Sequence, residues 1–527
     1  MKPSSPSKLA DPPAPTPKTL ENFDRAYATR IMLIMAAMVM TVMYIEGMLT
    51  PSLPQISQEF GVDYSQVSLV LSAYLITGVA LSPIAGKLGD IYGKKHVLSV
   101  VLVIYTVAVS VTGFSPSFTF MVASRAIQGV GLTIFPLAMS LVREEFPREM
   151  VPKAQGLLSG LFGAGFAVSL PLGAFVSNSF GWRWTYHSAI PVVVLITIAT
   201  IIVLRESPYR RPNAFIDYVG AGFLAGSLAC IVLALSQGPS WGWTSFSVLA
   251  LFATGGILLV PTALVEILYH RRGKEVILDV RLLSERNVMV ANLVLTVAGF
   301  AMFLAFQAFT FRLDEPVAAG GFAQDTFHIG LSFVAFAIPM LIFAPLASLF
   351  VTRVGTKPLT LLGSIVGAVG FYAATRAGTL VELLLSMFVI GAGLAILNSS
   401  VINILVLTVE PRDMGLATAM NATFRNVGSA LGAPLAGSLM STYTVLVMTQ
   451  IPGTPYSSLQ QQPNGTAFLY AFLIAAVALL LAGFISLFAK EILGKRAHKE
   501  ALASDERDEK PLGTEVPALG TPLRAQS

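Results

Sequence analysis

Charged residues are scarce in this chain of 527 residues: Asp, Glu, Lys and Arg together make up 12% of it, whereas hydrophobic residues make up 54%. An ordinary soluble domain carries about 25% charged residues. Much of the charge lies at the two ends, since residues 1–30 hold 8 of the 63 charged side chains and residues 490–527 hold 14. The 459 residues between them are therefore about 9% charged, a level that soluble folds do not reach and that a protein with many membrane spans requires.

Cysteines and catalytic motifs are also scarce. Cys230 is the single cysteine, so no intrachain disulfide forms. None of the five histidines begins the zinc-binding pattern His-Glu-x-x-His, and the segment from Gly89 to Lys94 has the wrong spacing for a phosphate-binding loop. We therefore expect no enzyme, metal or cofactor. The net charge of +5 is not clustered on a soluble face, which excludes a nucleic-acid binder.

Long apolar runs fill the middle of the chain. A helix needs roughly 20 residues to cross about 30 Å of hydrocarbon. Fourteen runs approach or exceed this length, near residues 31–50, 66–86, 97–113, 118–142, 155–178, 185–204, 216–236, 245–268, 289–311, 328–351, 358–376, 380–408, 414–445 and 466–489. The sequence thus predicts an all-α membrane protein with fourteen transmembrane helices.

The basic residues predict the orientation of these spans, because Lys and Arg resist translocation across a membrane. With the N-terminus placed inside, the inside segments carry 29 of the 34 basic residues and the outside loops carry three, while Arg125 and Arg425 fall within spans. We therefore expect a multi-pass protein of the plasma or inner membrane with both termini cytoplasmic. The tails, residues 1–30 and 490–527, are predicted to be disordered, because they offer few large apolar side chains to offset the ordering entropy. The first apolar run is a full span, so no cleavable signal peptide is expected.

An internal repeat divides the spans into two halves. The stretch from Leu81 to Lys95 matches the stretch from Phe343 to Lys357 at an offset of 262 residues, and the same offset places Gly129 on Gly391. A match that continues through several spans indicates a duplicated unit. We predict a six-helix bundle over residues 31–204, two inserted helices over 215–268 and a second six-helix bundle over 289–489. Each half has an even number of spans, so the halves are parallel repeats.

The loop after the second span reads Gly86-Lys-Leu-Gly-Asp90-Ile-Tyr-Gly93-Lys94-Lys95. This pattern resembles the loop signature of the major facilitator superfamily. Its glycines allow a tight turn, and its charges can pair with neighbouring helix ends. In that family the loop latches the two halves in one state of alternating access; the other interpretation is an ordinary basic inside loop. The second half keeps the glycine but has Thr352 where the first has an aspartate. The predicted latch residues are Gly86, Asp90, Gly93, Lys94, Lys95 and Gly355.

Two charges inside the spans are the strongest candidates for a functional site. Arg125 opens the segment Arg125-Ala-Ile-Gln128-Gly129-Val-Gly131, which resembles the fourth-span signature of the same superfamily. A buried arginine is costly unless it faces a cavity or a partner. Glu46 lies at a similar depth in the first span, and we predict that it binds the coupling proton with Arg125 as its charge partner. A static structural pair is the alternative.

The fifth span resembles the Gly-Pro-rich antiporter signature of drug:proton exporters, carried here by Gly163, Gly165, Pro171 and Gly173. Plain packing of small residues is the alternative. The segments Gly181–Trp184, Ile277–Arg281 and Arg425–Gly428 resemble parts of the fourteen-helix drug:proton antiporter branch. Arg425 is predicted to take part in proton coupling by facing the cavity, where it would meet Glu46 or an anionic substrate group, or else to hold structure through hydrogen bonds.

Uncharged polar residues within spans are candidates for lining a substrate cavity, and each has helix packing as its alternative role. They are Tyr44, Tyr74, Gln128, Asn292, Gln307, Asn398 and Asn403. Together these features predict a monomeric secondary transporter that exports amphipathic small molecules or drugs by proton antiport, with the proton gradient as its energy source. The alternatives are a proton symporter or facilitator that takes up a metabolite, and a membrane receptor that transports nothing.

Overall fold

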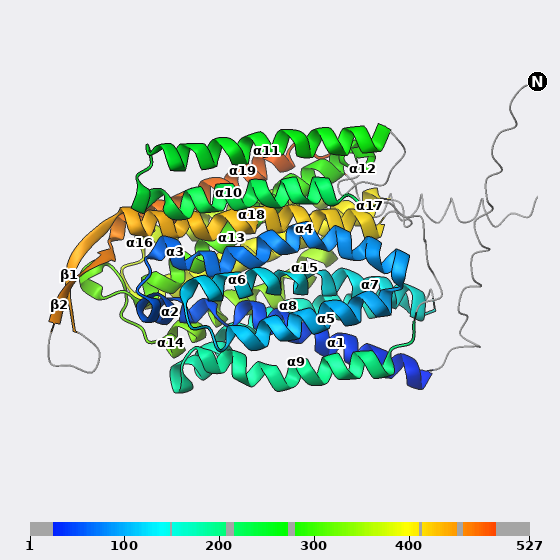
Figure 1. The fold of residues 1–527 in the computed structure, drawn as a ribbon. Coiled ribbons are helices and arrows are strands. Elements are labelled where there is room, and N and C mark those ends of the chain that lie inside the picture. Colours follow the sequence, from blue (N-terminus) through cyan, green and yellow to red (C-terminus); the bar gives the residue numbers. More distant parts are fainter. Residues whose placement is uncertain are drawn as a thin grey trace, which may run out of the picture.

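A computed structural model describes residues 25–147, 150–206, 216–271, 280–409, 414–450 and 457–491. Its long helices run side by side along one direction, and a β-hairpin extends from one end of the bundle (Figure 1). We call this end the hairpin end and the other, where helix α1 begins, the base. The superfamily architecture predicted from the sequence is thus matched by an almost entirely helical bundle.

The first half is built mainly from helices that alternate in direction. Its elements are α1 (Arg25–Gly47), a 3₁₀ turn (Thr50–Ser52), α2 (Leu53–Phe60), α3 (Tyr64–Val67), α4 (Leu69–Tyr92), α5 (Lys94–Thr112), α6 (Phe118–Gln128), a 3₁₀ segment (Gly129–Thr133), α7 (Ile134–Glu145), α8 (Val151–Phe180) and α9 (Arg183–Val203). The predicted fourth span is therefore α6 and α7 joined by a 3₁₀ segment.

The inserted pair and the second half follow. The inserted pair comprises α10 (Tyr218–Trp241) and α11 (Phe246–Arg271), and the short α12 (Val280–Ser284) leads into the second half. The second half comprises α13 (Arg286–Asp314), a 3₁₀ turn (Val317–Ala319), α14 (Thr326–Ser332), α15 (Val334–Val354), α16 (Thr356–Arg376), α17 (Leu380–Thr408), α18 (Met414–Thr442), β1 (Thr444–Gln450), β2 (Ser457–Pro463) and α19 (Gly465–Ser486). The strands are antiparallel, with Thr444 opposite Pro463.

Among the described residues, twelve stretches are long and apolar enough to cross a membrane. Two further helices, α8 with 30 residues and α18 with 29, pack along α1 and α13 within the same bundle. The prediction of fourteen spans includes both of them. The hairpin was not predicted: the expected thirteenth span ran to residue 445, whereas α18 ends at Thr442 and the chain turns into β1.

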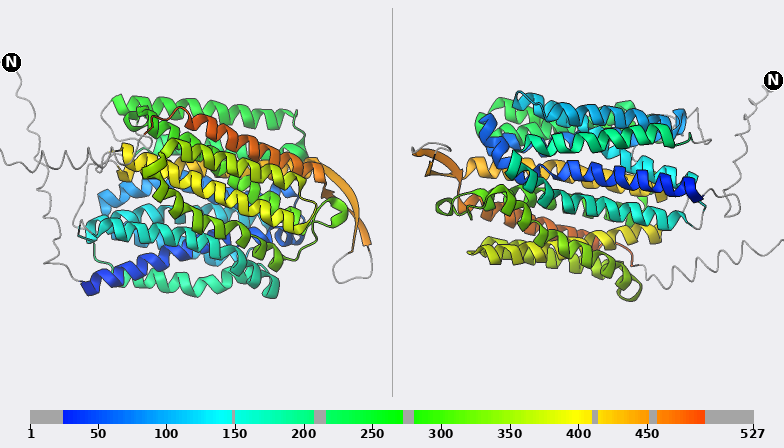
Figure 2. Two further views of the ribbon diagram at one scale, coloured as in Figure 1. Left: turned by 180° about the vertical axis from the view of Figure 1, so that it is seen from behind. Right: turned by 90° about the horizontal axis from the view of Figure 1, so that it is seen from below.

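Large apolar side chains cover the outside of the bundle. Phe246 is 87% exposed, Ile202 74% and Leu349 71%. Water would strongly disfavour so much exposed apolar surface, but a bilayer accommodates it. The two views in Figure 2 show the helices packed as a slab of roughly parallel rods, as expected of a multi-pass membrane protein.

The repeat detected in the sequence is reflected in the backbone. Gly93, which ends α4, has φ +102°, and Gly355, which ends α15, has φ +97°. Only glycine adopts this region without strain. Two positions related by the offset of 262 residues therefore turn the chain at the base in the same way.

Candidate functional site

Glu46 and Arg125 form a buried ion pair in the first half. Glu46 lies one residue before the end of α1, Arg125 lies in the last turn of α6, and the distance from Glu46 Oε2 to Arg125 Nη1 is 3.4 Å. Their side chains are 2% and 0% exposed. Tyr105 of α5 donates a hydrogen bond of 3.3 Å to Glu46 Oε1. The structure thus brings together the two charges that were predicted to form the coupling site.

The pair keeps unused hydrogen-bonding capacity. Within the described part of the chain, Glu46 Oε2 and Arg125 Nη2 are buried without a hydrogen-bond partner. A buried polar atom without a partner carries a desolvation cost of about 1–3 kcal/mol. Breaking a buried pair by removing one charge costs more, about 3–5 kcal/mol, because the other charge remains. Protonation of Glu46 would therefore leave the buried charge of Arg125 without its counter-charge.

Besides the ion pair with Glu46, three contacts hold the Arg125 side chain in place. Its Nε donates to the Val70 carbonyl at 3.1 Å, and its Nη1 donates to Gln128 Oε1 at 2.9 Å. The guanidinium carbon lies 4.3 Å from the centre of the Tyr74 ring, a cation–π contact. Gln128 is fully buried and also donates to Thr112, so it supports Arg125 in this structure, and its role in a substrate cavity stays a prediction.

Glycines in the fourth-span signature make this close packing possible. A Cβ atom at Gly131 would collide with the Tyr105 ring, and one at Gly129 would collide with the Tyr74 carbonyl. Both glycines belong to the 3₁₀ segment that follows Arg125. The signature therefore positions an arginine and also removes the side chains that would keep Tyr105 and α4 away from it.

Arg425 of α18 approaches the same region from the second half. It is close enough to Tyr74 for the two to interact electrostatically. Helix α18 lies tightly against α13 here, because a Cβ atom at Gly299 would collide with the Arg425 carbonyl. Tyr74 thus interacts with an arginine from each half, Arg125 and Arg425. Glu46 forms its ion pair with Arg125.

The other predicted cavity residues mostly serve helix packing. Asn421 donates to Asn292 Oδ1 at 2.9 Å, which ties α18 to α13. Asn398 donates to the carbonyl of Leu394 within its own helix. Asn403 donates to Ser348 of α15 and to Ser399 of its own helix. Tyr44 interacts with Ser188 of α9.

The glycines of α8 pack it against α1. A Cβ atom at Gly165 would lie 2.7 Å from the Met40 carbonyl, and one at Gly173 would collide with the Met48 carbonyl. A Cβ atom at Gly163 would meet nothing within 4 Å. Gly165 and Gly173 therefore let α8 approach α1 near Glu46, whereas Gly163 faces open space.

Five phenylalanines gather where the halves meet. Phe166 of α8 stacks on Phe306 of α13 with ring centres 5.5 Å apart, and Phe306 also contacts Phe303, Phe333 and Phe336 at 5.3–5.7 Å. We call these five residues the aromatic cluster. Phe303 packs with Tyr74 in a shared apolar cluster. Sequence reasoning missed this cluster, and only the spacing of three residues within Phe303/Phe306 and Phe333/Phe336 could have suggested it.

The halves are joined at the hairpin end. Gln55 donates to Thr326 at 2.8 Å, and the Ser65 amide donates to Ser441 Oγ at 3.0 Å. Gln307, predicted to line the cavity, instead donates to the Tyr64 carbonyl at 2.9 Å. The structure is therefore closed at this end.

Glu315 also lies at the hairpin end, just beyond α13. Burial, together with the neighbouring Asp314 charge, raises its pKa to about 8, and a hydrogen bond with Tyr64 opposes the shift. Only 3% of the residue is exposed. Because Tyr64 belongs to the first half and Glu315 to the second, this contact also crosses between the halves.

At the base, an acidic residue caps a helix in each half. Glu206 accepts hydrogen bonds from the amides of Lys95 and His96 at the start of α5 (3.2 and 3.1 Å), and Glu491 accepts one from the Thr356 amide at the start of α16 (2.9 Å). A carboxylate at a helix N-terminus is favoured by the helix dipole.

The predicted latch residues lie beside this cap in the first half. Lys94 pairs with Asp90 at 3.5 Å and with Glu144 at the end of α7. Gly86 has open space around it. The observed partners of Lys94 belong to its own half, so the latch role between the halves stays a prediction.

Comparisons with known proteins agree with this architecture. The sequence profile of the Major Facilitator Superfamily matches residues 34–313 and 295–524. The multidrug transporter protein MdtP of Bacillus subtilis is 26% identical over 405 residues, which are 76% of this chain and 72% of that protein. Multidrug resistance protein 3 of the same organism is 25% identical over 391 residues, covering 72% of this chain and 73% of that protein.

A solved structure shows the same fold. The partially occluded inward open conformation of the xylose transporter XylE from E. coli superposes with a TM-score of 0.59 at 15% identity, covering 89% of this chain and 99% of that one. The profile spans more than half of the chain, and the bundle has the fold of solved transporters. The chain therefore belongs to the Major Facilitator Superfamily, a family of membrane transporters and not of enzymes.

Proposed function

We propose that this transporter exports amphipathic small molecules in exchange for protons. The observation that carries the proposal is the buried pair of Glu46 and Arg125, which joins opposite charges of α1 and α6 inside the first half. A carboxylate in this position is a functional-site hypothesis by default. Relatives named as multidrug transporters support the class of substrate.

Proton binding at Glu46 neutralises the acid and leaves Arg125 without its ion-pair partner. Arg125 is held by α4 through the Val70 carbonyl and the Tyr74 ring. Helix α4 in turn packs against α18 of the second half. A change in the charge of Glu46 is therefore felt at the contact between the halves, where alternating access takes place.

The aromatic cluster provides a binding surface for the apolar part of a substrate. Its rings come from both halves, so a molecule bound there contacts both sides of the moving interface. Aromatic rings offer large contact area and also attract cations at their faces. Tyr74 packs with Phe303 of this cluster and interacts electrostatically with Arg425, and the two residues supply polar groups for the other part of an amphipathic molecule.

The proposal includes an orientation of the bundle in the membrane. Basic residues concentrate in the segments at the base, which supports an orientation with the base in the cytoplasm and the hairpin outside a plasma or inner membrane. The closed hairpin end then corresponds to a state open toward the cytoplasm, ready to take up a substrate for export. We expect one chain, acting as a monomer, to carry out the cycle, with the proton gradient as its only energy source.

Transport by the purified full-length protein in liposomes tests the proposal. An imposed proton gradient should drive ethidium out of the compartment that the base faces, and Glu46→Gln should abolish this coupling while the protein stays folded. Glu382→Gln at the exposed start of α17 is the matched control, because glutamine can still complete that helix cap. Proton-driven transport that survives Glu46→Gln would contradict the proposal, and accumulation in the opposite direction would indicate uptake symport.

A further inference from the structure

The two halves meet along two seams that differ in how they are covered. In the first seam, α4 of the first half packs against α18 of the second. Helix α10 lies over both, with Leu224 and Leu228 packed against Val79 of α4 and against partly buried residues of α18. Ser65 donates to the Ser236 carbonyl at 2.7 Å. The inserted helix therefore closes this seam toward the membrane.

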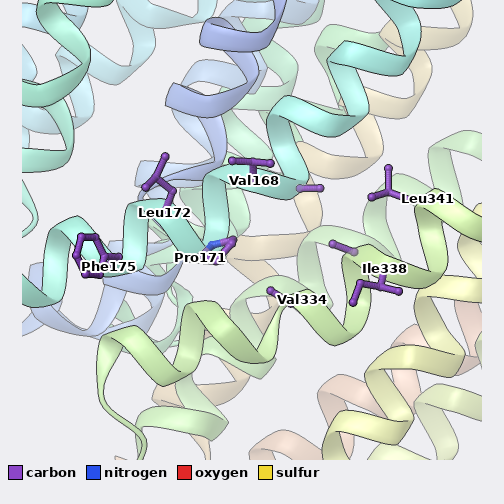
Figure 3. A pocket seen from close by; sticks show the side chains of 9 residues that line it. Val168, Pro171, Leu172, Phe175, Val334, Ile338 and Leu341 are labelled. Carbon is purple, nitrogen blue, oxygen red and sulfur yellow. The ribbon is translucent and has the colours of Figure 1, made fainter.

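The second seam, between α8 and α15, is left open toward the membrane. It holds a crevice of about 460 Å³ lined by nine apolar residues, and Figure 3 shows side chains of both helices facing it. Val168 and Leu172 of α8 are 43% and 46% exposed, and Ile338 and Leu341 of α15 are 45% and 55% exposed. Within the part of the chain that the structure describes, no polar side chain lines the crevice.

The crevice is closed toward the hairpin end and widens toward the base. At the hairpin end, a Cβ atom at Gly330 of α14 would collide with Ala174 and lie 2.7 Å from the Leu170 carbonyl, so α14 and α8 touch. Toward the base, Cβ atoms at Gly160 and Gly163 of α8 would meet nothing within 4 Å. Helix α8 is therefore covered by α14 near the hairpin end and uncovered at Gly160 and Gly163 toward the base.

Only a thin wall separates the crevice from the aromatic cluster. Ala167 and Ala337 line the crevice, and their sequence neighbours Phe166 and Phe336 both contact Phe306 on the inner side. At these residues α8 and α15 therefore border the crevice on one side and the aromatic cluster on the other. Because α15 belongs to a predicted membrane span, the medium outside the crevice is the hydrocarbon of the bilayer.

We propose that the seam between α8 and α15 is the route by which amphipathic substrates dissolved in the bilayer reach the aromatic cluster. Its occupant is the apolar part of such a substrate, because an all-carbon lining offers nothing to a hydrated molecule. Because α10 covers the seam between α4 and α18, the route lies only between α8 and α15. The inference rests on the proposed export of amphipathic compounds and names where they enter.

A reversible plug in the crevice tests this route without disturbing folding. Ile338→Cys is made in a Cys230→Ser background, so that the introduced thiol is unique, and the full-length protein is reconstituted in liposomes. Benzyl methanethiosulfonate then adds a bulky apolar group, and dithiothreitol removes it. Ala253→Cys on an exposed face of α11 is the matched control. The probe is a bisbenzimide dye that fluoresces in the bilayer and not in water.

Benzylation at position 338 should slow proton-driven extraction of the dye from the bilayer about tenfold, which corresponds to about 1.4 kcal/mol on the rate-limiting barrier. Dithiothreitol should restore the rate, and the α11 control should not respond. Transport of ethidium supplied from water is measured in parallel, because a blocked lateral route slows the first process whereas a locked bundle slows both. Equal slowing of both probes, or no effect of benzylation, would overturn the route. If the unmodified protein moves neither probe, the proposed export itself fails.

Discussion

The carboxylate of Glu206 occupies the space that a side chain at Gly93 would need. A Cβ atom at position 93 would collide with Glu206 Oε1, and the backbone there has φ +102°. The glycine thus has two functions, since it turns the chain between α4 and α5 and admits the acid that caps α5. The same relationship recurs between Gly355 and Glu491 in the second half. The loop signature is therefore explained in part by a helix cap at the base.

Replacing Gly93 by alanine should destabilise the protein. The positive φ of this backbone position alone costs a non-glycine residue about 1–3 kcal/mol, and displacement of Glu206 removes the cap from α5. We expect a lower melting temperature in detergent and reduced transport for Gly93→Ala. Gly86→Ala is the matched control, because a Cβ atom at Gly86 would meet nothing within 4 Å. Equal stability of the two variants would show that the cap contributes little.

Glu206→Gln separates the cap from the turn. Glutamine can still accept one hydrogen bond from the α5 amides but lacks the charge that favours a helix N-terminus, an effect of about 0.3–1 kcal/mol. We therefore expect a smaller loss of stability than for Gly93→Ala. A loss as large as that of Gly93→Ala would mean that the charge of Glu206, and not the backbone at Gly93, dominates.

The closed hairpin end should be sensitive to pH through Glu315. Its pKa is raised from 4.5 to about 8, so the folded, closed state favours the protonated acid. The stabilisation is fully present below about pH 4.5 and is lost as the pH rises through about 8. Thermal unfolding measured across this range should show falling stability for the wild type and a flatter profile for Glu315→Gln.

The control for this pH dependence is Glu382→Gln, which changes an exposed acid at the start of α17. Its profile should follow that of the wild type. Asp314 and Tyr64 also act on Glu315, so Tyr64→Phe should raise the midpoint of the transition further, because it removes a hydrogen bond that lowers the pKa. A Glu315→Gln profile as steep as that of the wild type would assign the titration to another group.

The orientation of the bundle can be tested with two exposed positions at opposite ends. Met448 in the hairpin is 66% exposed, and Tyr92 at the base end of α4 is 58% exposed. In a Cys230→Ser background, Met448→Cys should react with a membrane-impermeant maleimide on intact cells, whereas Tyr92→Cys should react only after permeabilisation. The reverse pattern would place the base outside and contradict the distribution of basic residues.

Scarcity of charge is what allowed the ion pair to be predicted from the sequence. In a chain with so few internal charges, Glu46 and Arg125 stood out, and their depths in the spans suggested a contact that the structure contains. The aromatic cluster could not be predicted in this way, because the chain has 33 phenylalanines and the sequence does not single out the ones that meet. Only tertiary packing selects the five that meet between the halves.

The hairpin was missed for a different reason. The β1 segment Thr444–Gln450 begins with residues apolar enough to continue a span, so hydropathy alone extends the helix into it. Its pairing with β2 is decided by a segment thirteen residues away, which local patterns do not report. Gln128 and Gln307 likewise looked like cavity residues, because a polar side chain in a span has the same sequence signature whether it faces a substrate or a neighbouring helix.

Gly131→Ala should weaken the coupling site without touching either charge. The added methyl group would collide with the Tyr105 ring and push its hydroxyl away from Glu46. We expect a loss of about 1–3 kcal/mol from overpacking and a reduced rate of proton-driven efflux. Tyr105→Phe, which removes the hydrogen bond without the collision, should cost only about 1 kcal/mol. Gly163→Ala is the control, because a Cβ atom there would meet nothing within 4 Å. If Gly131→Ala matched Gly163→Ala in melting temperature and efflux, the close approach of Tyr105 would have no part in coupling.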